Sequence, residues 1–288
     1  MRTLRAVRLT TEAARRLRDG CGTGRVHSAF AHTVNVKLDE AGDAAWVSLH
    51  APGPIPAPFG IACETWTVWR LPAGVPVRVE ASAIVLDGRL RVTLDGAAIS
   101  DTRLPALAPL PAVSGCLRDA LSGVSAGLLP AAAALLTGDP PPTDPISRAA
   151  WPALVRLCVA THSRSAPECL AAAHSLLGLG PGLTPAGDDC LVGWLAGARI
   201  AGEDGRELAT AVAPGLLVAA TDRTTPLSRA FLAAAAAGEA AEPVHGFALV
   251  PDTVRLAGLL RLGATSGADL LAGYLLARVA LAPSAGEG

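Results

Sequence analysis

Polar side chains of several common kinds are scarce or absent in this sequence. Its 288 residues include no glutamine, one asparagine (Asn35) and one lysine (Lys37), and only 3% of the residues are aromatic. The formal net charge is −1, so the chain lacks the basic excess that is typical of nucleic-acid-binding proteins. These shortages point away from recognition by basic patches or amide side chains, and they make the only asparagine a candidate for a specific role.

Other missing patterns bear on compartment and cofactors. The six cysteines form no C-x-x-C pair and no paired Cys/His spacing, which argues against a zinc site or a redox dithiol. The basic N-terminal stretch lacks the apolar run of a signal peptide. The uncharged run between Asp119 and Asp139 contains a proline and three glycines, which favours a buried helix over a membrane span. We therefore expect a cytoplasmic protein that binds neither a membrane nor a nucleic acid.

The hydrophobic residues, 51% of the chain, follow two different patterns. From about position 25 to 92 they form short β-branched runs separated by glycine and proline, and Asp87-Gly88 between two such runs predicts a tight hairpin. Beyond a proline-rich stretch, Ala- and Leu-rich segments carry helical spacing. The sequence thus predicts an α+β protein, with a β-rich domain over 1–110 that is either a small barrel or an open antiparallel sheet, followed by an α-helical domain over 111–288.

These patterns also give approximate element positions. The expected strands are VHSAF, TVNVKL, AAWVSL, TWTVW, VPVRVE, AIVL and RLRVTL, and the expected helical segments are roughly 113–137, 146–177, 187–201, 205–221, 226–238, 246–262 and 267–281.

The most informative segment is GLGPGLTPAGDD, residues 178–189. Four glycines and two prolines within ten residues constrain the backbone and leave it uncovered by side chains. We expect a helix to begin near Gly187 with unpaired N–H groups in its first turn, which suit a phosphate or a carboxylate. The segment is not a Walker loop, because it has no Gly-Lys-Ser/Thr, and its glycine spacing is not that of a dinucleotide fingerprint.

Two adjacent aspartates, Asp188 and Asp189, close this segment. Three uses fit them: holding Mg²⁺ that bridges to a phosphate, accepting hydrogen bonds from a substrate amide, or acting as a general base. Consecutive side chains on a helix point about 100° apart, so one aspartate can cap the helix while the other faces a ligand. A helix cap without any ligand is the structural alternative.

The helical half contains a short internal sequence repeat. The pattern Gly187-x-Asp189-x-Leu191-x-Gly193 aligns without gaps on Gly267-x-Asp269-x-Leu271-x-Gly273. Close packing of two helices on their glycines explains this, and so does a pseudo-symmetric pair of helix starts that face one site.

Polar residues elsewhere complete the set of candidates. Alone, a histidine on a strand is more often structural, and hydroxyls at a helix start usually serve as caps. The candidate substrate-binding residues are His27, Ser28, Asn35, Gly180, Gly182, Thr184, Gly187, Thr225, Ser228, Ser266 and Asp269, and Asp188 and Asp189 are the candidate catalytic residues or Mg²⁺ ligands.

Four segments in this order resemble a bacterial family of unknown general function. They are GRVHSAFAHTVNV (24–36), GLGPGLTPAGDD (178–189), TTPLSRAFLAAAAAGE (224–239) and GATSGADLLAGYL (263–275). The family includes a subunit of oxamate carbamoyltransferase from anaerobic allantoin degradation, a part of purine catabolism. The family pattern favours serine after Thr-Pro, where this chain has Ala186.

The resemblance implies a place in a hetero-oligomeric transferase. That complex converts oxalurate and phosphate to oxamate and carbamoyl phosphate, and by analogy the loop at 178–189 would hold carbamoyl phosphate or the oxamate carboxylate, with Asp188 or Asp189 on the transferred amide. Three functions stay open: a carbamoyltransferase-type subunit, a non-catalytic ligand-binding or scaffolding subunit, and a stand-alone Mg²⁺-dependent hydrolase. The expected partners are other subunits of the complex or further copies of this chain.

Overall fold

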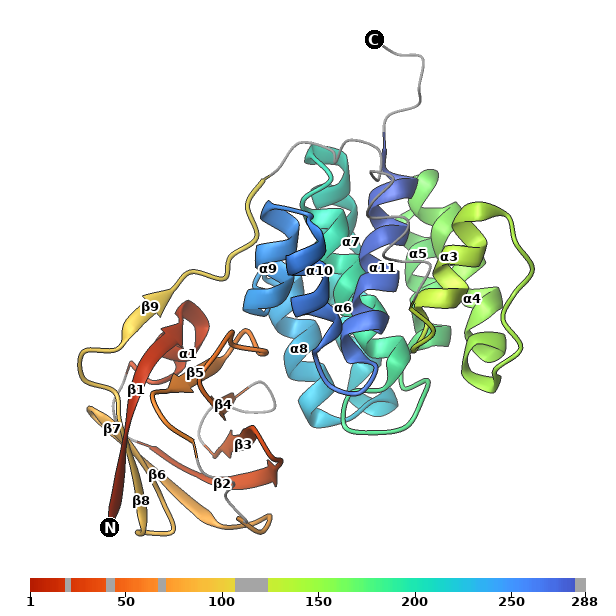
Figure 1. Cartoon of the computed structure of the whole chain (residues 1–288). Helices are drawn as coiled ribbons and strands as arrows, with labels where there is room; N and C mark the ends of the chain where they lie inside the picture. The colour runs from red at the N-terminus through yellow and green to blue at the C-terminus, as the bar shows by residue number, and fades with distance from the viewer. Residues whose placement is uncertain (19–21, 40–44, 67–70, 107–123, 283–288) are drawn as a thin grey trace. The chain divides into compact units, whose positions relative to one another are not determined.

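The computed structural model describes residues 1–18, 22–39, 45–66, 71–106 and 124–282 (Figure 1). The chain divides into two compact units. The barrel unit comprises Met1–Arg103 together with Glu239–Pro243, and the helical unit comprises Leu104–Gly238 and Val244–Gly288. The domain boundary expected at 110/111 lies outside the described residues.

The barrel unit is built from nine described strands. They are β1 (Arg2–Thr10), β2 (Gly22–Ala29), β3 (Thr33–Leu38), β4 (Trp46–His50), β5 (Gly60–Cys63), β6 (Pro76–Glu80), β7 (Ala83–Leu86), β8 (Leu90–Thr93) and β9 (Ala98–Ser100), with helix α1 (Thr11–Arg16) after β1. Eight strands close in the order β5-β4-β3-β2-β6-β7-β8-β1, because β1 also pairs with β5, and β9 pairs with the end of β1. The small barrel is therefore confirmed, but it is a mixed one, since β1–β8, β1–β9 and β4–β5 are parallel.

Alternating side chains fill this barrel. On β3, Val34, Val36 and Leu38 are buried in the barrel core, so the residues between them lie on its outer face. The predicted hairpin is also confirmed: Asp87 and Gly88 join β7 to β8 with φ values of +53° and +63°, the left-handed conformation that such a turn requires. The predicted strand at 65–69 lies mostly outside the described residues.

The first strand, β1, was not predicted. Leu4 and Ala6 are buried, but the next buried hydrophobic residue is Leu9, because an irregularity between Ala6 and Arg8 in the pairing with β5 shifts the alternation by one residue. A β-bulge of this kind breaks the period of two that identifies a strand in sequence. β5 and β9, only four and three residues long, also gave no recognisable pattern.

The helical unit contains the remaining described helices. They are α3 (Leu129–Thr137), α4 (Pro145–His162), α5 (Ala166–Leu176), α6 (Ala186–Arg199), α7 (Glu203–Arg223), α8 (Pro226–Ala236), α9 (Glu242–Leu249, starting in the segment of the barrel unit), α10 (Thr253–Leu260) and α11 (Ser266–Ala280). The fold class α+β is thus confirmed. Two expected helical segments are divided: 146–177 breaks at Arg164, which has a φ of +55°, and 246–262 breaks at Pro251, just before the cap Asp252 of α10.

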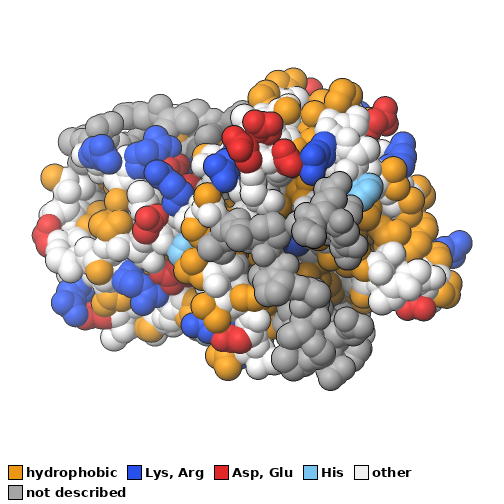
Figure 2. Space-filling view, turned by 90° about the horizontal axis from the view of Figure 1, so that it is seen from above, with side chains coloured by type: hydrophobic (Ala, Val, Ile, Leu, Met, Phe, Trp, Pro, Cys, Tyr) orange, Lys and Arg blue, Asp and Glu red, His pale blue; other side chains and the backbone are white. Residues whose placement is uncertain are grey.

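The surface matches the near-neutral composition. Figure 2 shows basic and acidic side chains interspersed over the face that it presents, with hydrophobic side chains between them. Among the described helices, none combines the length and the hydropathy needed to cross a bilayer.

Candidate functional site

The α6 and α11 helices form the centre of the site in the helical unit, and they lie side by side in Figure 1. They run in the same direction, because Gly193 of α6 contacts Leu270 and Gly197 contacts Tyr274 further along α11. The contact is reciprocal: a Cβ at Gly193 would overlap the carbonyl oxygen of Leu270, and one at Gly273 would overlap that of Cys190. The internal sequence repeat therefore corresponds to a pseudo-two-fold pair of helices, in which the glycines permit close approach of the two backbones.

This pairing brings two carboxyl groups together at the N-terminal ends of the helices. Asp189 and Asp269 are each the fourth residue of their helix, with 5% and 0% of their surface exposed. Oδ1 of Asp269 accepts the N–H of Leu128 at 2.6 Å. Within the part of the chain that the structure describes, Oδ2 of Asp189 and Oδ2 of Asp269 have no hydrogen-bond partner.

The electrostatic environment of this carboxyl pair favours the protonated form of Asp189. Burial is the main cause that raises the pKa of Asp189 to about 8, and the charges of Asp269 and Asp188 act in the same direction. Hydrogen bonds with Ser266 and Thr184 oppose these effects. Burial also raises the pKa of Asp269. At pH 7 Asp189 is therefore mainly protonated, and the pair offers a carboxylic acid beside a second carboxyl group.

Two hydroxyl groups lie beside the pair. The Oγ1 of Thr184, in the loop before α6, is 3.3 Å from the Oγ of Ser266, the first residue of α11. The structure therefore brings four predicted site residues together: Thr184, Asp189, Ser266 and Asp269.

The neighbouring Asp188 has a different environment. Its Oδ1 accepts the N–H of Gly178 at 2.8 Å, and its Oδ2 accepts the hydroxyls of Ser228, at 2.8 Å, and of Thr224. Burial raises the pKa of Asp188, and these hydrogen bonds counteract it. The carboxyl group is thus fully occupied in joining the loop 178–185 to the start of α8.

The glycine-rich loop folds tightly against the helix that it precedes. Gly178, Gly180 and Gly182 have positive φ values, and a side chain at Gly178 would overlap the carbonyl oxygen of Arg223. A side chain at Gly187 would likewise overlap the carbonyl oxygen of Leu176. The loop therefore needs these glycines for its own packing.

One expectation about this helix start is wrong. The N–H of Gly187 donates to Leu179 O at 2.9 Å, and those of Asp188 and Asp189 donate to Pro185 O at 2.9 and 3.1 Å. The carbonyls of the loop turn back onto the first turn of α6, so these three N–H groups are not free to bind an anion. The hydroxyls of the predicted helix start at 225–228 are also used internally, because Thr225 caps α8 through the N–H of Ser228 and donates to Leu183 O.

The other predicted residues form a separate network in the barrel unit. Ser48 on β4 donates to Oδ1 of Asn35 at 2.7 Å, and Nδ2 of Asn35 donates to Ser28 Oγ at 3.0 Å. Ser28 Oγ lies 3.3 Å from Nδ1 of His27, whose ring packs edge-on against Trp46. His27, Ser28 and Asn35 are therefore brought together as predicted neighbours, and Ser48 joins them.

The sequence analysis did not identify several residues that contact Asp188 or Asp269. Thr224 binds Asp188, and Leu128 binds Asp269 from the start of α3, where a side chain at Gly127 would collide with the Asp269 carboxyl. Position alone could have suggested Thr224, which directly precedes the predicted cap Thr225. Nothing in the sequence near Gly127 indicates a contact 142 positions further along.

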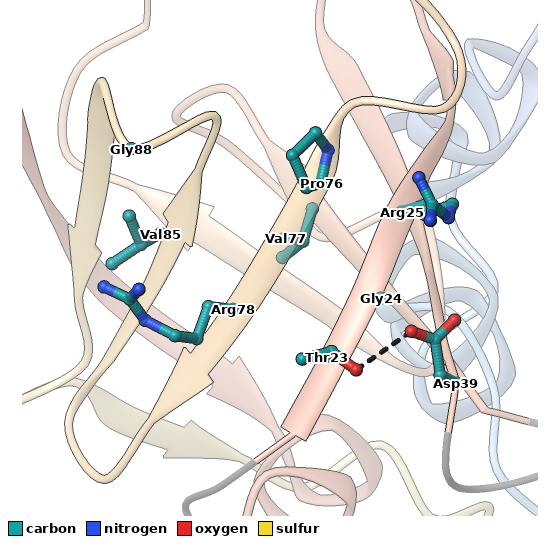
Figure 3. Close-up of a pocket in the computed structure, with 9 residues that line it drawn as sticks. All are labelled: Thr23, Gly24, Arg25, Asp39, Pro76, Val77, Arg78, Val85 and Gly88. Carbon is teal, nitrogen blue, oxygen red and sulfur yellow. Dashed lines mark hydrogen bonds between the residues drawn. The ribbon is translucent and has the colours of Figure 1, made fainter.

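Two other features of the described residues bear on ligands. No group of three or more His, Cys, Asp or Glu side chains among them is arranged to hold a metal ion, and the use of Mg²⁺ by Asp188 and Asp189 stays a prediction. In the barrel unit, an open depression of about 460 Å³ is lined by residues of β2, β6 and β7, including Arg25 and Arg78, and by Asp39, which follows β3 (Figure 3). Arg78 forms an ion pair with Glu80 at 2.8 Å, and Arg25 donates to the carbonyl oxygen of Gly74 at 3.2 Å.

Comparison with known protein families identifies the family of this chain. Residues 176–278 match the family model of oxamate carbamoyltransferase subunit AllH, and residues 5–99 match that of the AllH family N-terminal domain. The chain belongs to the AllH family. The two AllH matches together cover more than half of the chain, and each falls mainly within one of the two units. No curated protein and no solved structure matches the chain. Membership in the AllH family makes this chain a relative of a transferase subunit.

Proposed function

We propose that this chain is a carbamoyltransferase-type subunit that binds the carbamoyl-containing ligand at Asp189 and Asp269. One observation carries the proposal: paired helices each carry a buried carboxyl group near their N-terminal end, the two groups interact electrostatically, and each has one oxygen without a hydrogen-bond partner among the described residues. Leaving buried polar atoms unpaired costs roughly 1–3 kcal/mol each. A ligand that satisfies both atoms would recover this cost.

The chemistry of the pair fits a planar primary amide, in which an amino nitrogen and a carbonyl oxygen lie side by side. Oxamate and carbamoyl phosphate, the compounds that the family description implies, share this group next to an anionic one. A protonated Asp189 can donate to the carbonyl oxygen, while the carboxylate of Asp269 can accept an N–H. The hydroxyls of Thr184 and Ser266 can donate to the anionic group, and the N-terminal ends of α6 and α11 favour negative charge nearby.

The same residues supply what the transfer requires. When oxamate is carbamoylated, its nitrogen forms a bond to the carbamoyl carbon, the bond from that carbon to the phosphate oxygen breaks, and the nitrogen gives up a proton. An Asp269 carboxylate within reach of the nitrogen can accept this proton, and protonated Asp189 can stabilise the negative charge that develops on the carbamoyl oxygen. In this proposal Asp188 positions the loop and does not touch the ligand.

A second candidate follows from the description of the family as one subunit of an enzyme. In it, this chain binds the ligand at the same pair, and a partner subunit provides the reacting groups. The two candidates differ in kinetics, because loss of binding alone raises KM, whereas loss of a group that acts in the transition state lowers kcat.

The test uses the complex reconstituted with its partner subunits. Asp189→Asn and Asp269→Asn should each lower the rate of carbamoyl transfer to oxamate by about 100-fold or more, and the control Asp204→Asn, a surface carboxyl on α7, should not. A fall in kcat supports the catalytic role, and a rise in KM alone supports the binding role. Unchanged kinetics in both variants would exclude a ligand at this pair.

A further inference from the structure

The two aspartates of the carboxyl pair, Asp189 and Asp269, hold equivalent places on their own helices. Each is the fourth residue of its helix, and its main-chain N–H donates to the carbonyl oxygen of the N-cap residue, Pro185 in α6 and Thr265 in α11. A site with this internal symmetry would accept a planar amide in two opposite orientations. Whatever breaks the symmetry therefore determines which carboxyl group acts as the acid.

A third helix, α3, breaks this symmetry. It packs against α11 (Figure 1), and the N–H of its N-cap residue, Leu128, donates to Oδ1 of Asp269 at 2.6 Å. The side chain of Leu128 cannot cap the helix, and the first turn of α3 contains no acidic residue. Asp269 therefore caps α3 from a different helix, and the positive end of the α3 dipole lies at its carboxyl group.

The hydrogen-bonding groups at the two carboxyls also differ in kind. Asp189 is hydrogen-bonded with the hydroxyls of Ser266 and Thr184, and a hydroxyl can either donate to a carboxylate or accept from a carboxylic acid. The main-chain N–H of Leu128 can only donate, and its bond to Asp269 is stronger when that acceptor is charged. The surroundings of Asp189 thus suit either protonation state, whereas this donor favours the carboxylate of Asp269.

The chain just before α3 lies directly against the same carboxyl group. Gly127 has a φ of +58°, and a Cβ there would lie 2.3 Å from Oδ1 of Asp269. Leu128 and Asp269 are both wholly buried. The carboxyl group therefore has little freedom to turn away from the N–H, and its Oδ2, which has no hydrogen-bond partner among the described residues, is left for a ligand.

The titratable groups around Asp269 are compatible with this assignment. Burial raises its pKa, and the N–H of Leu128 is the largest effect that opposes burial, ahead of the hydroxyl of Thr265. On α6, Asp188 raises the pKa of Asp189, and burial keeps the Cys190 thiol protonated by raising its pKa. Helix α3 contains no titratable side chain, and the charged side chains of α4 and α10, which also pack against α11, are exposed.

We propose that the N-terminal end of α3 determines which aspartate is ionised: the N–H of Leu128 holds Asp269 as the carboxylate, and the proton of the pair stays on Asp189. Gly127 and Leu128 are positioning residues, because they act on a ligand only through Asp269. This inference deepens the proposed function and rests on it for the ligand, whose amide N–H would meet Asp269 and whose carbonyl oxygen would meet Asp189. The ionisation itself is a property of the chain without a ligand and is measured separately.

Carbon NMR of the full chain, labelled with carbon-13 in the aspartate carboxyl groups, locates the proton. Asp189→Asn and Asp269→Asn identify the two signals by their loss. We expect the Asp269 signal to report a carboxylate at pH 7 and the Asp189 signal a carboxylic acid, and the amide signal of Leu128 to shift as Asp269 ionises. The opposite order of ionisation would overturn the proposal, and this measurement needs no altered α3.

Removing the N–H of Leu128 tests the cause. Replacement of Leu128 by its α-hydroxy acid turns one amide into an ester and keeps the side chain. The ionisation constant of Asp269 should fall by about tenfold or more, the equivalent of a hydrogen bond to a charged group. In the reconstituted complex, the acidic limb of the pH profile of carbamoyl transfer should move to higher pH. The same replacement at Ala132, whose N–H donates to Leu128 O at 3.0 Å, is the matched control and should change neither quantity.

A second variant serves if the ester-containing chain does not fold. Gly127→Ala should move the start of α3 away from Asp269 and change the titration in the same direction. Gly138→Ala, at the other end of α3, is the matched control: its φ is +79°, so it carries the same kind of backbone strain, but its Cβ meets open space.

The outcomes separate this inference from the proposed function. An unchanged titration of Asp269 in the folded ester or Gly127→Ala chain would refute the role of α3, whatever the effect of Asp189→Asn on carbamoyl transfer. A changed titration with an unaltered pH profile of transfer would support the role of α3 and count against the proposed function.

Discussion

At the scale of single residues, two adjacent aspartates on α6 have opposite tasks. Both oxygens of Asp188 are occupied by three donors, whereas Asp189 keeps one oxygen without a partner in the described structure. The sequence predicts that one of two consecutive helical side chains caps the helix while the other faces a ligand, and the ligand-facing role stays a prediction. It could not show which, because the answer depends on Thr224 and Ser228, about 40 residues further along the chain.

The protonation of Asp189 makes stability depend on pH. Its pKa is about 8 in the folded protein and 3.8 in a model peptide, so the folded state holds the extra proton between these values. The free energy of unfolding should therefore fall as the pH rises through this interval, by up to about 1.4 kcal/mol per pH unit. Asp189→Asn lacks this proton and should gain stability relative to the wild type between about pH 5 and about pH 8.

Urea denaturation of both proteins across this pH range gives the measurement. Asp188 and Asp269 are present in both, so their own titrations largely cancel in the comparison. The surface variant Asp204→Asn serves as the control. A stability difference between Asp189→Asn and wild type that stays constant with pH would contradict a protonated Asp189.

At the scale of elements, sequence patterns predict what is regular and miss what interrupts it. The hairpin at Asp87-Gly88 and the helix starts near Gly187 and Gly267 are confirmed, because turn chemistry and helical spacing are local properties. The strand β1 is missed because its pairing irregularity disturbs the alternation, and the free N–H groups expected on α6 are taken by carbonyls of its own loop. Both errors arise from contacts that a local pattern does not contain.

The paired helices depend on glycine at their crossing. Gly193→Ala would place a Cβ on the carbonyl oxygen of Leu270, so α6 and α11 would have to separate. We expect a loss of about 1–3 kcal/mol or more in the free energy of unfolding. Gly258→Ala on α10, where a Cβ meets open space, should instead gain about 0.5–1 kcal/mol.

Calorimetry on the two variants provides a matched comparison, because both replace a helical glycine by alanine. If Gly193→Ala were as stable as Gly258→Ala, the close helix contact would be refuted. Partial loss of carbamoyl transfer in a still folded Gly193→Ala protein would show that the distance between Asp189 and Asp269 matters.

At the scale of the whole molecule, the barrel unit is completed by a distant segment. Glu242 accepts Arg8 Nη2 at 3.0 Å, the N–H of Ile55 at 2.7 Å and the hydroxyl of Ser100 at 2.6 Å, and its own N–H donates to Ile55 O. Ala240 also donates to Thr102 O at 3.0 Å. Neither the composition nor the spacing of residues 239–243 marks them as part of a β-rich unit, so this tie was not predictable.

Glu242→Ala should therefore destabilise the barrel unit by about 2–3 kcal/mol, because it leaves the Ile55 N–H without its acceptor and the Arg8 guanidinium with only the carbonyl oxygen of Gly53. Hydrogen exchange can locate the effect, which we expect as lost protection at Ile55 and along β1. Glu207→Ala, on the exposed surface of α7, is the matched control and should leave this protection unchanged. Protection lost only in the helical unit would contradict the assignment.

The late position of this segment also has a consequence during synthesis. Synthesis runs from the N-terminus, so about 140 residues are added to the chain between residue 103 and residue 243. At bacterial-type elongation rates of about 5–20 residues per second, this interval lasts roughly 7–30 s. During that time the helical unit is being synthesised and Glu242 is absent. Arg8, the N–H of Ile55 and the hydroxyl of Ser100 therefore lack the carboxylate to which they donate in the complete chain.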